Sequence, residues 1–230
     1  MKKIIILLAL VLLSGLSVKA ETSEVIYGNA IIEAQNKIDE IGFKILNSNG
    51  IENRTVFDFN TKNVKNAYSR SRDRQIVIYR GLYNRLNSED EIAAVLSHEI
   101  SHSVDSYDGI FRGYFSSWSY AFASKKYEYK ADKKAVDYMV NAGYNPVAYI
   151  VVMSKTFPQE RYDWYSSHPL STRRMMEVYE YIYKKYPEYL VNNKYKNDLY
   201  YQNFLLTSKE NRAKFQKKIE SNSTGRVNYL

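Results

Sequence analysis

The sequence predicts a predominantly helical α+β fold with a small β-sheet. Most of the chain divides into long segments with apolar residues at helical spacing. Only two short stretches, residues 54–59 and 75–79, are rich in β-forming residues. No internal repeat or low-complexity linker marks a second domain, and 230 residues are enough for one substantial core. We therefore expect a single folded domain.

The first twenty residues have the features of a secretory signal peptide. Two lysines precede a short apolar run, and Val18-Lys19-Ala20 predicts cleavage before Glu21. An uncleaved N-terminal anchor is the alternative. No later stretch approaches the roughly 18 apolar residues that a membrane span needs. We expect residues 21–230 to form an exported domain, periplasmic or extracellular, without an integral membrane span, for which peripheral membrane association stays open.

The composition argues against two classes of protein. The chain has no cysteine, so neither disulfides nor a lipid-modified N-terminal cysteine contribute. The formal charge of +8 is dispersed among mixed-sign stretches, without a basic stripe carrying interleaved aromatics. The sequence therefore gives no indication of nucleic-acid binding.

The N-terminal part predicts one helix and two strands. Apolar residues recur near one face over residues 24–47, which predicts a helix. Residues 54–59 (RTVFDF) alternate and predict a strand. Residues 75–79 (QIVIY) are the clearest strand, bounded by charged residues and Gly81. We expect this second strand to be an edge strand.

A helix begins after Ser88. Ser88 and Glu91 have the spacing of a capping box, in which each side chain satisfies a backbone N–H that the helix start leaves without a partner. Apolar residues recur at helical spacing over residues 92–100. A less regular segment, 103–119, contains two glycines and several aromatics, and we expect it to form a loop over a cleft.

This helix carries an HExxH pattern, His98-Glu99-Ile100-Ser101-His102. His98 and His102 lie one turn apart on one face, so two imidazoles can bind one metal ion. Glu99 lies beside them, placed to accept a proton from a metal-bound water. The alternative is an ordinary amphipathic helix with two histidines on its polar edge.

Catalytic zinc takes three protein ligands and leaves one position for water. A third histidine at the elongated HExxHxxGxxH spacing is excluded, because aspartates stand at both further positions that this pattern specifies. A carboxylate from a following helix is the remaining common solution, and Glu128 is the candidate, with Asp132 one turn later. One would bind the metal and the other would hydrogen-bond a ligand imidazole. The alternative interpretation is that Glu128 and Asp132 are an exposed acid pair beside lysines. Glu160 and Asp163 are the further candidates for the third ligand.

The second half predicts more helices. Caps and terminators place them at residues 122–142, 146–156 and 171–186. Gly143 is placed to end the first of these in the left-handed conformation, and a loop is expected at 158–167. Residues 187–230 form a polar C-terminal extension, helical near 199–219, and we expect its last ten residues to be frayed or disordered.

Four motifs, in order, resemble the HtpX-type and CAAX-prenyl-protease-type zinc metallopeptidases, which are gluzincins. They are an N-A-aromatic element (Asn66-Ala67-Tyr68), a zinc-helix signature (91–102), an E-x-x-A-D and AGYxP segment (127–146), and an S-H-P-x-x-x-x-R motif (167–174). The resemblance runs from about residue 25 to 186, and it is nearest to the small, exported, single-domain branch.

This resemblance implies a zincin-like metallopeptidase domain with one Zn²⁺ per chain. It implies His98, His102 and Glu128 as metal ligands and Glu99 as general base. It also implies a catalytic proton-donor role for Asp132. On physical grounds we favour Asp132 as an orienting residue, because an ionised aspartate close to a divalent cation is a poor acid.

His168 has two possible catalytic roles and one structural alternative. With substrate bound, its imidazole could donate a hydrogen bond to the oxyanion, which is the role we favour. Without substrate, it could occupy the open metal position and keep the enzyme latent. The structural alternative is a surface histidine in a turn. Arg174 is expected to fix this loop by pairing with Asp132 or Glu177, and Asn66 to lie close to the substrate.

The expected function is zinc-dependent endoproteolysis of unfolded or misfolded proteins in the cell envelope. We expect an extended protein or peptide substrate to pair with the strand at 75–79. A non-catalytic, chaperone-like binding protein is the main alternative, although a closed structural zinc site needs a fourth ligand and only His168 is available. A zinc hydrolase that cleaves a non-peptide bond is a second alternative.

Overall fold

The computed structural model describes residues 27–70, 74–107, 116–156 and 171–229. The expected signal peptide, the loop at 158–167 and His168 lie outside these residues. A helix over residues 27–48 confirms the first predicted helix. The other elements are β1 (Val56–Asn60), β2 (Ala67–Arg70), β3 (Gln75–Tyr79), α2 (Arg80–Tyr83), α3 (Glu89–Tyr107), α4 (Ser116–Asn141), α5 (Val147–Thr156), α6 (Ser171–Lys185), α7 (Glu188–Val191), α8 (Leu199–Thr207) and α9 (Lys209–Glu220).

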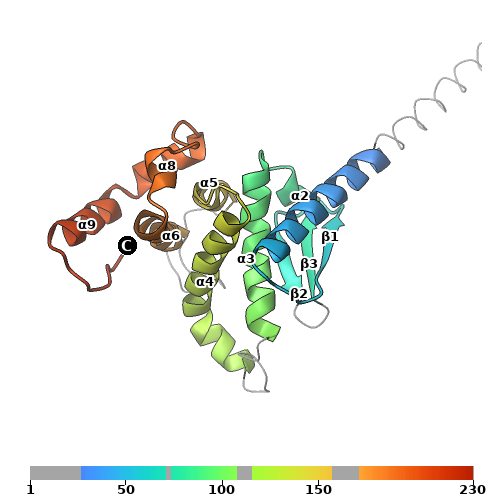
Figure 1. The fold of residues 1–230 in the computed structure, drawn as a ribbon, viewed down its shortest axis with the longest axis horizontal. Coiled ribbons are helices and arrows are strands. Elements are labelled where there is room, and N and C mark those ends of the chain that lie inside the picture. Colours follow the sequence, from blue (N-terminus) through green and yellow to red (C-terminus); the bar gives the residue numbers. More distant parts are fainter. Residues whose placement is uncertain (1–26, 71–73, 108–115, 157–170, 230) are drawn as a thin grey trace, which may run out of the picture.

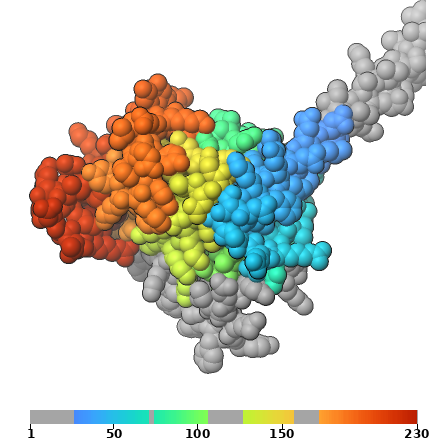
Figure 2. All heavy atoms as spheres, in the orientation of Figure 1, coloured from blue at the N-terminus to red at the C-terminus, as the bar shows by residue number. Residues whose placement is uncertain are grey.

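Helix α3 lies in the middle of the molecule. The N-terminal helix and the sheet lie on one side of it, and α4, α5 and α6 lie on the other (Figure 1). Figure 2 shows the N-terminal helix and the pair α8–α9 at opposite ends. The fold is therefore predominantly helical with a small sheet, as the sequence predicts. No helix among the residues described is long and apolar enough to cross a membrane.

The sheet has the strand order β1-β3-β2, with β1 parallel and β2 antiparallel to β3. The expectation that residues 75–79 form an edge strand is therefore wrong, because β3 is the central strand. Its three middle residues, 76–78, are almost inaccessible to solvent, and a continuous apolar run is typical of a strand buried on both faces. The short β2 carries weaker β-forming residues and escaped prediction.

The two edges of the sheet differ in what covers them. On β1, the Gln35 side chain of the N-terminal helix donates to Phe57 O (2.8 Å) and accepts from Phe59 N (2.8 Å). The Gln35 amide thus occupies two of the hydrogen-bonding groups of β1, Phe57 O and Phe59 N. The β2 edge lies next to α3, where Asn66 and Ala67 line a cavity. The edge beside α3 is therefore the one that an extended chain could reach.

Helix α3 starts as predicted and ends later than predicted. Glu91 N donates to Ser88 Oγ (3.3 Å), which confirms the cap, while the Glu91 carboxylate accepts from Asn87 N (3.1 Å) and from the buried Lys155 ammonium (2.6 Å). The helix then continues past His102 to Tyr107, so the expectation of an irregular segment is wrong for residues 103–107. Residues 108–115 of that predicted segment lie outside those described.

Contacts with α4 explain the longer helix. Ser103 and Asp105 are buried, and Asp105 pairs with Lys130 and Lys134 of α4. These charge pairs replace the contacts with water that would otherwise favour a loop. Helix α4 also begins earlier than predicted, at Ser116.

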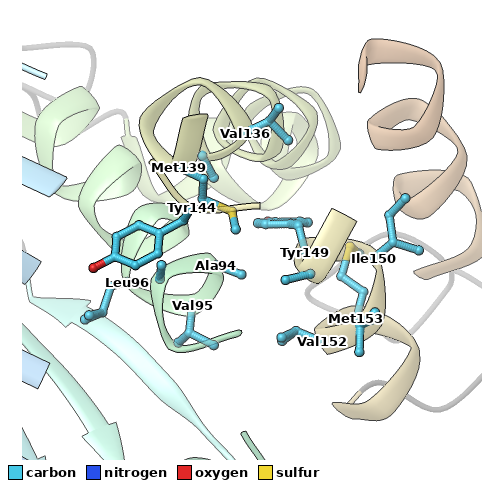
Figure 3. Close-up of a cluster of buried hydrophobic side chains, with 14 of the residues drawn as sticks. Ala94, Val95, Leu96, Val136, Met139, Tyr144, Tyr149, Ile150, Val152 and Met153 are labelled. Atoms are coloured by element: carbon cyan, nitrogen blue, oxygen red, sulfur yellow. The ribbon is translucent and has the colours of Figure 1, made fainter. Parts of the chain in front are cut away.

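The junction between α4 and α5 lies where the sequence predicts it. Gly143 adopts a left-handed conformation (φ 78°) and ends α4, and α5 begins directly after Pro146. Nearly every α5 residue is buried. Figure 3 shows the core that forms where α5 meets α3 and α4.

The C-terminal extension differs from the prediction in two ways. The helix expected near 199–219 is interrupted at Ser208, whose hydroxyl donates to Phe204 O (2.6 Å). The last residues, expected to fray, instead fold back: Tyr229 is buried, and Arg226 pairs with Glu177 (2.9 Å). The extension therefore packs against α6.

Candidate metal centre

Helices α3 and α4 bring three metal-binding side chains together. His98 and His102 on α3 place their Nε2 atoms 3.1 Å apart. Glu128 on α4 lies with one carboxylate oxygen 3.3 Å from His102 Nε2 and the other 3.6 Å from His98 Nε2. Ligand atoms bound at 2.0–2.1 Å to a tetrahedral zinc ion lie about 3.3–3.5 Å apart. The donor set and its spacing therefore fit one zinc ion.

The local sequence explains why the two helices approach so closely here. Ala131 is 1% exposed and leaves room for α3. The hydroxyl of Ser101, buried in the same layer, donates to Ala131 O (3.3 Å). This bond ties the turn between the two histidines to the turn after Glu128.

Asp132 and Arg174 form a buried pair behind the donor set. Arg174 donates through Nε to one Asp132 oxygen (2.8 Å) and through Nη2 to the other (2.6 Å). Its Nη1 lies 3.0 Å from Glu128. The predicted pairing of Arg174 with Asp132 is thus present, and the same guanidinium also orients the candidate metal ligand. Glu177, the other partner considered for Arg174, pairs with Lys133 (3.0 Å).

The protonation state of Asp132 follows from these contacts. Burial alone would raise the pKa of its carboxyl, but the charge and hydrogen bonds of Arg174, with a contribution from His98, outweigh burial and lower the pKa to about 2. Asp132 is therefore ionised at neutral pH and accepts hydrogen bonds. This state supports an orienting role for Asp132 over the proton-donor role that the resemblance implies.

Tyr149 on α5 connects Asp132 to the first histidine. Its hydroxyl donates to Asp132 (2.5 Å) and lies 2.7 Å from His98 Nδ1. Burial and the nearby Asp132 charge raise the pKa of Tyr149 well above its usual value, so it remains a neutral phenol. Since its single proton goes to Asp132, its oxygen accepts from His98 Nδ1–H. His98 Nε2 then keeps a lone pair that faces the other donors.

Sequence reasoning did not identify Tyr149. One signal was available, because Tyr149 is the only residue with a polar side chain in the run 147–153 (VAYIVVM). A buried tyrosine hydroxyl normally finds a hydrogen-bond partner.

A cavity of about 110 Å³ opens beside the donor set. Glu99 and His98 line it, and Asn66 and Ala67 line it from the β2 side. The structure therefore places the predicted general base and Asn66 at one cavity. Nothing is described for the remaining site candidates, His168, Glu160 and Asp163, because they lie outside the residues described.

A comparison with protein families agrees with this arrangement. The model of "Peptidase family M48" matches residues 33–117 and 106–182, which together make up well over half of the chain. The match includes α3, α4, α5 and most of α6, and with them each residue described above at the donor set. No curated protein matches the chain. With a two-histidine, one-glutamate donor set inside the matched region, the chain belongs to peptidase family M48, and its activity is that of a metallopeptidase.

Proposed function

We propose that the protein is a zinc-dependent endopeptidase whose ligands are His98, His102 and Glu128. One observation carries the proposal: three donor groups of the types that zinc prefers lie within 4.8 Å of one another, at the spacing of a tetrahedral site. When bound, zinc would polarise the scissile carbonyl and make a water molecule more acidic.

The chain's own residues supply the remaining chemistry. Glu99 accepts the proton of the attacking water and passes it to the leaving amine. Tyr149 and Asp132 hold His98 with Nε2 toward the metal position. Arg174 keeps Asp132 charged and orients both Asp132 and Glu128. These residues have roles in binding, orientation and proton transfer that need no further cofactor.

The cavity favours catalysis over a purely structural zinc site. Structural zinc is enclosed by four protein ligands, whereas a catalytic site keeps one side open. The cavity beside His98 and Glu99 gives that open side. This observation supports the enzyme over the chaperone-like alternative.

The substrate is proposed to be an extended segment of an unfolded or misfolded protein. Since β3 is central, we transfer the pairing role to the β2 edge, which reaches the same cavity through Asn66 and Ala67. Folded proteins rarely offer an unpaired extended segment, so unfolded chains are the natural class. The leader-like N-terminal sequence supports an activity in the cell envelope, periplasmic or extracellular. His168 keeps its proposed oxyanion role.

Cleavage of casein, an unfolded protein, tests the proposal. Wild-type protein with one zinc per chain should cleave casein, lose the activity with a chelator, and regain it with zinc. Glu99→Gln should keep zinc and lose activity by about 10²–10⁴-fold. Chelator-resistant cleavage, or a fully active Glu99→Gln variant, would rule out this mechanism.

A further inference from the structure

Helix α8 of the C-terminal extension exposes an apolar surface. Leu199 is 82% exposed and Leu206 is 76% exposed, and Val191 of the preceding α7 is 81% exposed. These are the three most exposed large hydrophobic side chains in the part of the chain that the structure describes. Leu199 and Leu206 are seven residues apart, so they lie on one face of α8. The family match ends at residue 182, so this surface belongs to the extension.

The opposite face of α8 is also apolar. Tyr201 and Phe204 are buried, and the Phe204 ring packs against the Tyr179 ring of α6, with 5.7 Å between the ring centroids. No residue of the helix (LYYQNFLLT) is charged. A helix that is apolar on both faces is normally buried, either in a protein core or in a membrane. Helix α8 lies instead at the edge of the molecule (Figure 1), and its outer face is exposed among the residues described.

The charges of the extension are mainly positive. Residues 187–230 contain eight lysines and arginines and four acidic residues. Exposed lysines stand before and after α8, at Lys196 and Lys209. Asp198 and Glu210, the acids next to α8 in the sequence, lie at helix starts, where the helix dipole offsets their charge. The extension therefore attracts an anionic surface and repels a second copy of itself.

We propose that the outer face of α8 binds the surface of a lipid bilayer that contains anionic lipids. Leu199 and Leu206 enter the boundary between headgroups and acyl chains, as in helices that lie in the plane of a membrane. Tyr200, which is 38% exposed, lies at headgroup level. Lys196 and Lys209 pair with lipid phosphates. The inference is independent of the proposed peptidase chemistry, because none of these residues lies at the metal centre.

A fluorescent label on α8 tests the proposal with the full-length protein. The chain has no cysteine, so Asn203→Cys gives a single labelling site on the exposed face between the two leucines. A polarity-sensitive dye at this site should shift its emission to the blue when vesicles containing phosphatidylglycerol are added. Ser48→Cys, exposed at the end of the N-terminal helix, is the matched control, and its dye should not shift.

Substitutions then separate the apolar from the electrostatic contribution to vesicle affinity, titrated with the dye at position 203. Leu199→Ala and Leu206→Ala should each weaken the affinity by about tenfold. Lys196→Gln should weaken it by about fivefold. Ile32→Ala shortens another exposed side chain (58%), on the N-terminal helix, and should leave the affinity unchanged.

The local readout makes each failure recognisable. If the chain binds vesicles only through its N-terminal residues, the dye at position 203 does not shift, and the proposal is overturned. Equal shifts at positions 203 and 48, or an affinity that neither leucine substitution changes, would also overturn it. A blue shift that grows with protein concentration in the absence of vesicles would identify a second copy of the chain as the occupant instead.

Discussion

At the residue scale, Tyr149 decides which nitrogen of His98 faces the other metal-binding atoms. Arg174 holds Asp132 in the ionised form, Asp132 accepts the Tyr149 proton, and Tyr149 accepts the proton of His98 Nδ1. Each link fixes the direction of the next, because each partner can donate or accept in only one way here. The chain of three bonds therefore sets the imidazole tautomer in which His98 Nε2 presents a lone pair to the proposed metal position.

Tyr149→Phe should weaken zinc binding by about tenfold, because losing an outer partner of a ligand histidine typically costs 10–100-fold in metal affinity. Competition with a zinc-binding dye measures the affinity. Tyr144→Phe is the control, since Tyr144 is also buried and its hydroxyl points away from Tyr149 (Figure 3). Equal affinities for the two variants would mean that Asp132, 3.3 Å from His98 Nδ1, orients the ring without the tyrosine.

Residues related by the helical repeat could be grouped from the sequence. His98 and His102 lie one turn apart, as do Glu128 and Asp132, whatever the rest of the fold does. The meeting of Tyr149 with Asp132 depends instead on how α5 crosses α3 and α4. That crossing is set by the packing of many side chains, and no local pattern encodes it.

At the element scale, the two edge strands of the sheet differ: β2 lies at the site, whereas the N-terminal helix covers β1. Tyr79 N donates to Asn66 O (3.1 Å), so the backbone of Asn66 faces β3. Backbone direction alternates along an antiparallel strand, and the N–H of Ala67 therefore faces outward. Ala67 also lines the cavity. We expect this N–H to bond an extended substrate.

Ala67→Pro should lower kcat/KM for an unfolded substrate by about tenfold, because it removes one hydrogen bond worth about 1 kcal/mol or slightly more. It should leave the melting temperature nearly unchanged, since no β2–β3 bond is lost. Ala67→Val adds bulk and keeps the N–H, so it serves as the control. Similar kcat/KM values for both variants would contradict pairing at this edge.

Strand order was harder to predict than strand location. The run QIVIY at 75–79 identified β3, but its pairing partners lie outside the pattern of one strand. Its continuous apolar character did contain the evidence for a central position. Likewise, the extent of α3 beyond His102 depends on the contacts of Asp105 with α4 lysines, which the segment itself does not encode.

At the scale of the whole molecule, the C-terminal extension braces the helix that carries Arg174. The family match ends at residue 182, so α7, α8 and α9 lie beyond it. Glu180 on α6 accepts hydrogen bonds from Lys184, from Lys218 of α9 (2.9 Å) and from Tyr229 near the chain end. These contacts connect the last residues of the chain to the middle of the fold.

The Glu180 contacts should make stability depend on pH. Burial alone would raise its pKa, but bonds from Lys184, Tyr229 and Lys218 lower the pKa from 4.5 to about 2. A pKa lowered by folding stabilises the fold above pH 4.5, and this contribution is lost as the pH falls toward 2. Glu180→Gln should therefore reduce the free energy of unfolding by about 1 kcal/mol at pH 6, allowing for solvent screening.

Urea unfolding of the metal-free protein at several pH values measures this effect. The difference between wild type and Glu180→Gln should shrink between pH 4.5 and 2. Glu188→Gln changes an exposed glutamate of α7 and should show no such trend. A difference for Glu180→Gln that stays constant with pH would mean that its charge does not hold the extension.

We propose that His98, His102 and Glu128 bind one zinc ion and that Glu99 does not bind it. Metal content per chain, measured at low free zinc on wild type, Glu99→Ala and Glu128→Ala, tests it most directly. We expect one zinc per chain in wild type and Glu99→Ala, and little or none in Glu128→Ala, because each ligand is part of the coordination geometry. Stoichiometric zinc in Glu128→Ala, or loss of zinc from Glu99→Ala, would contradict it.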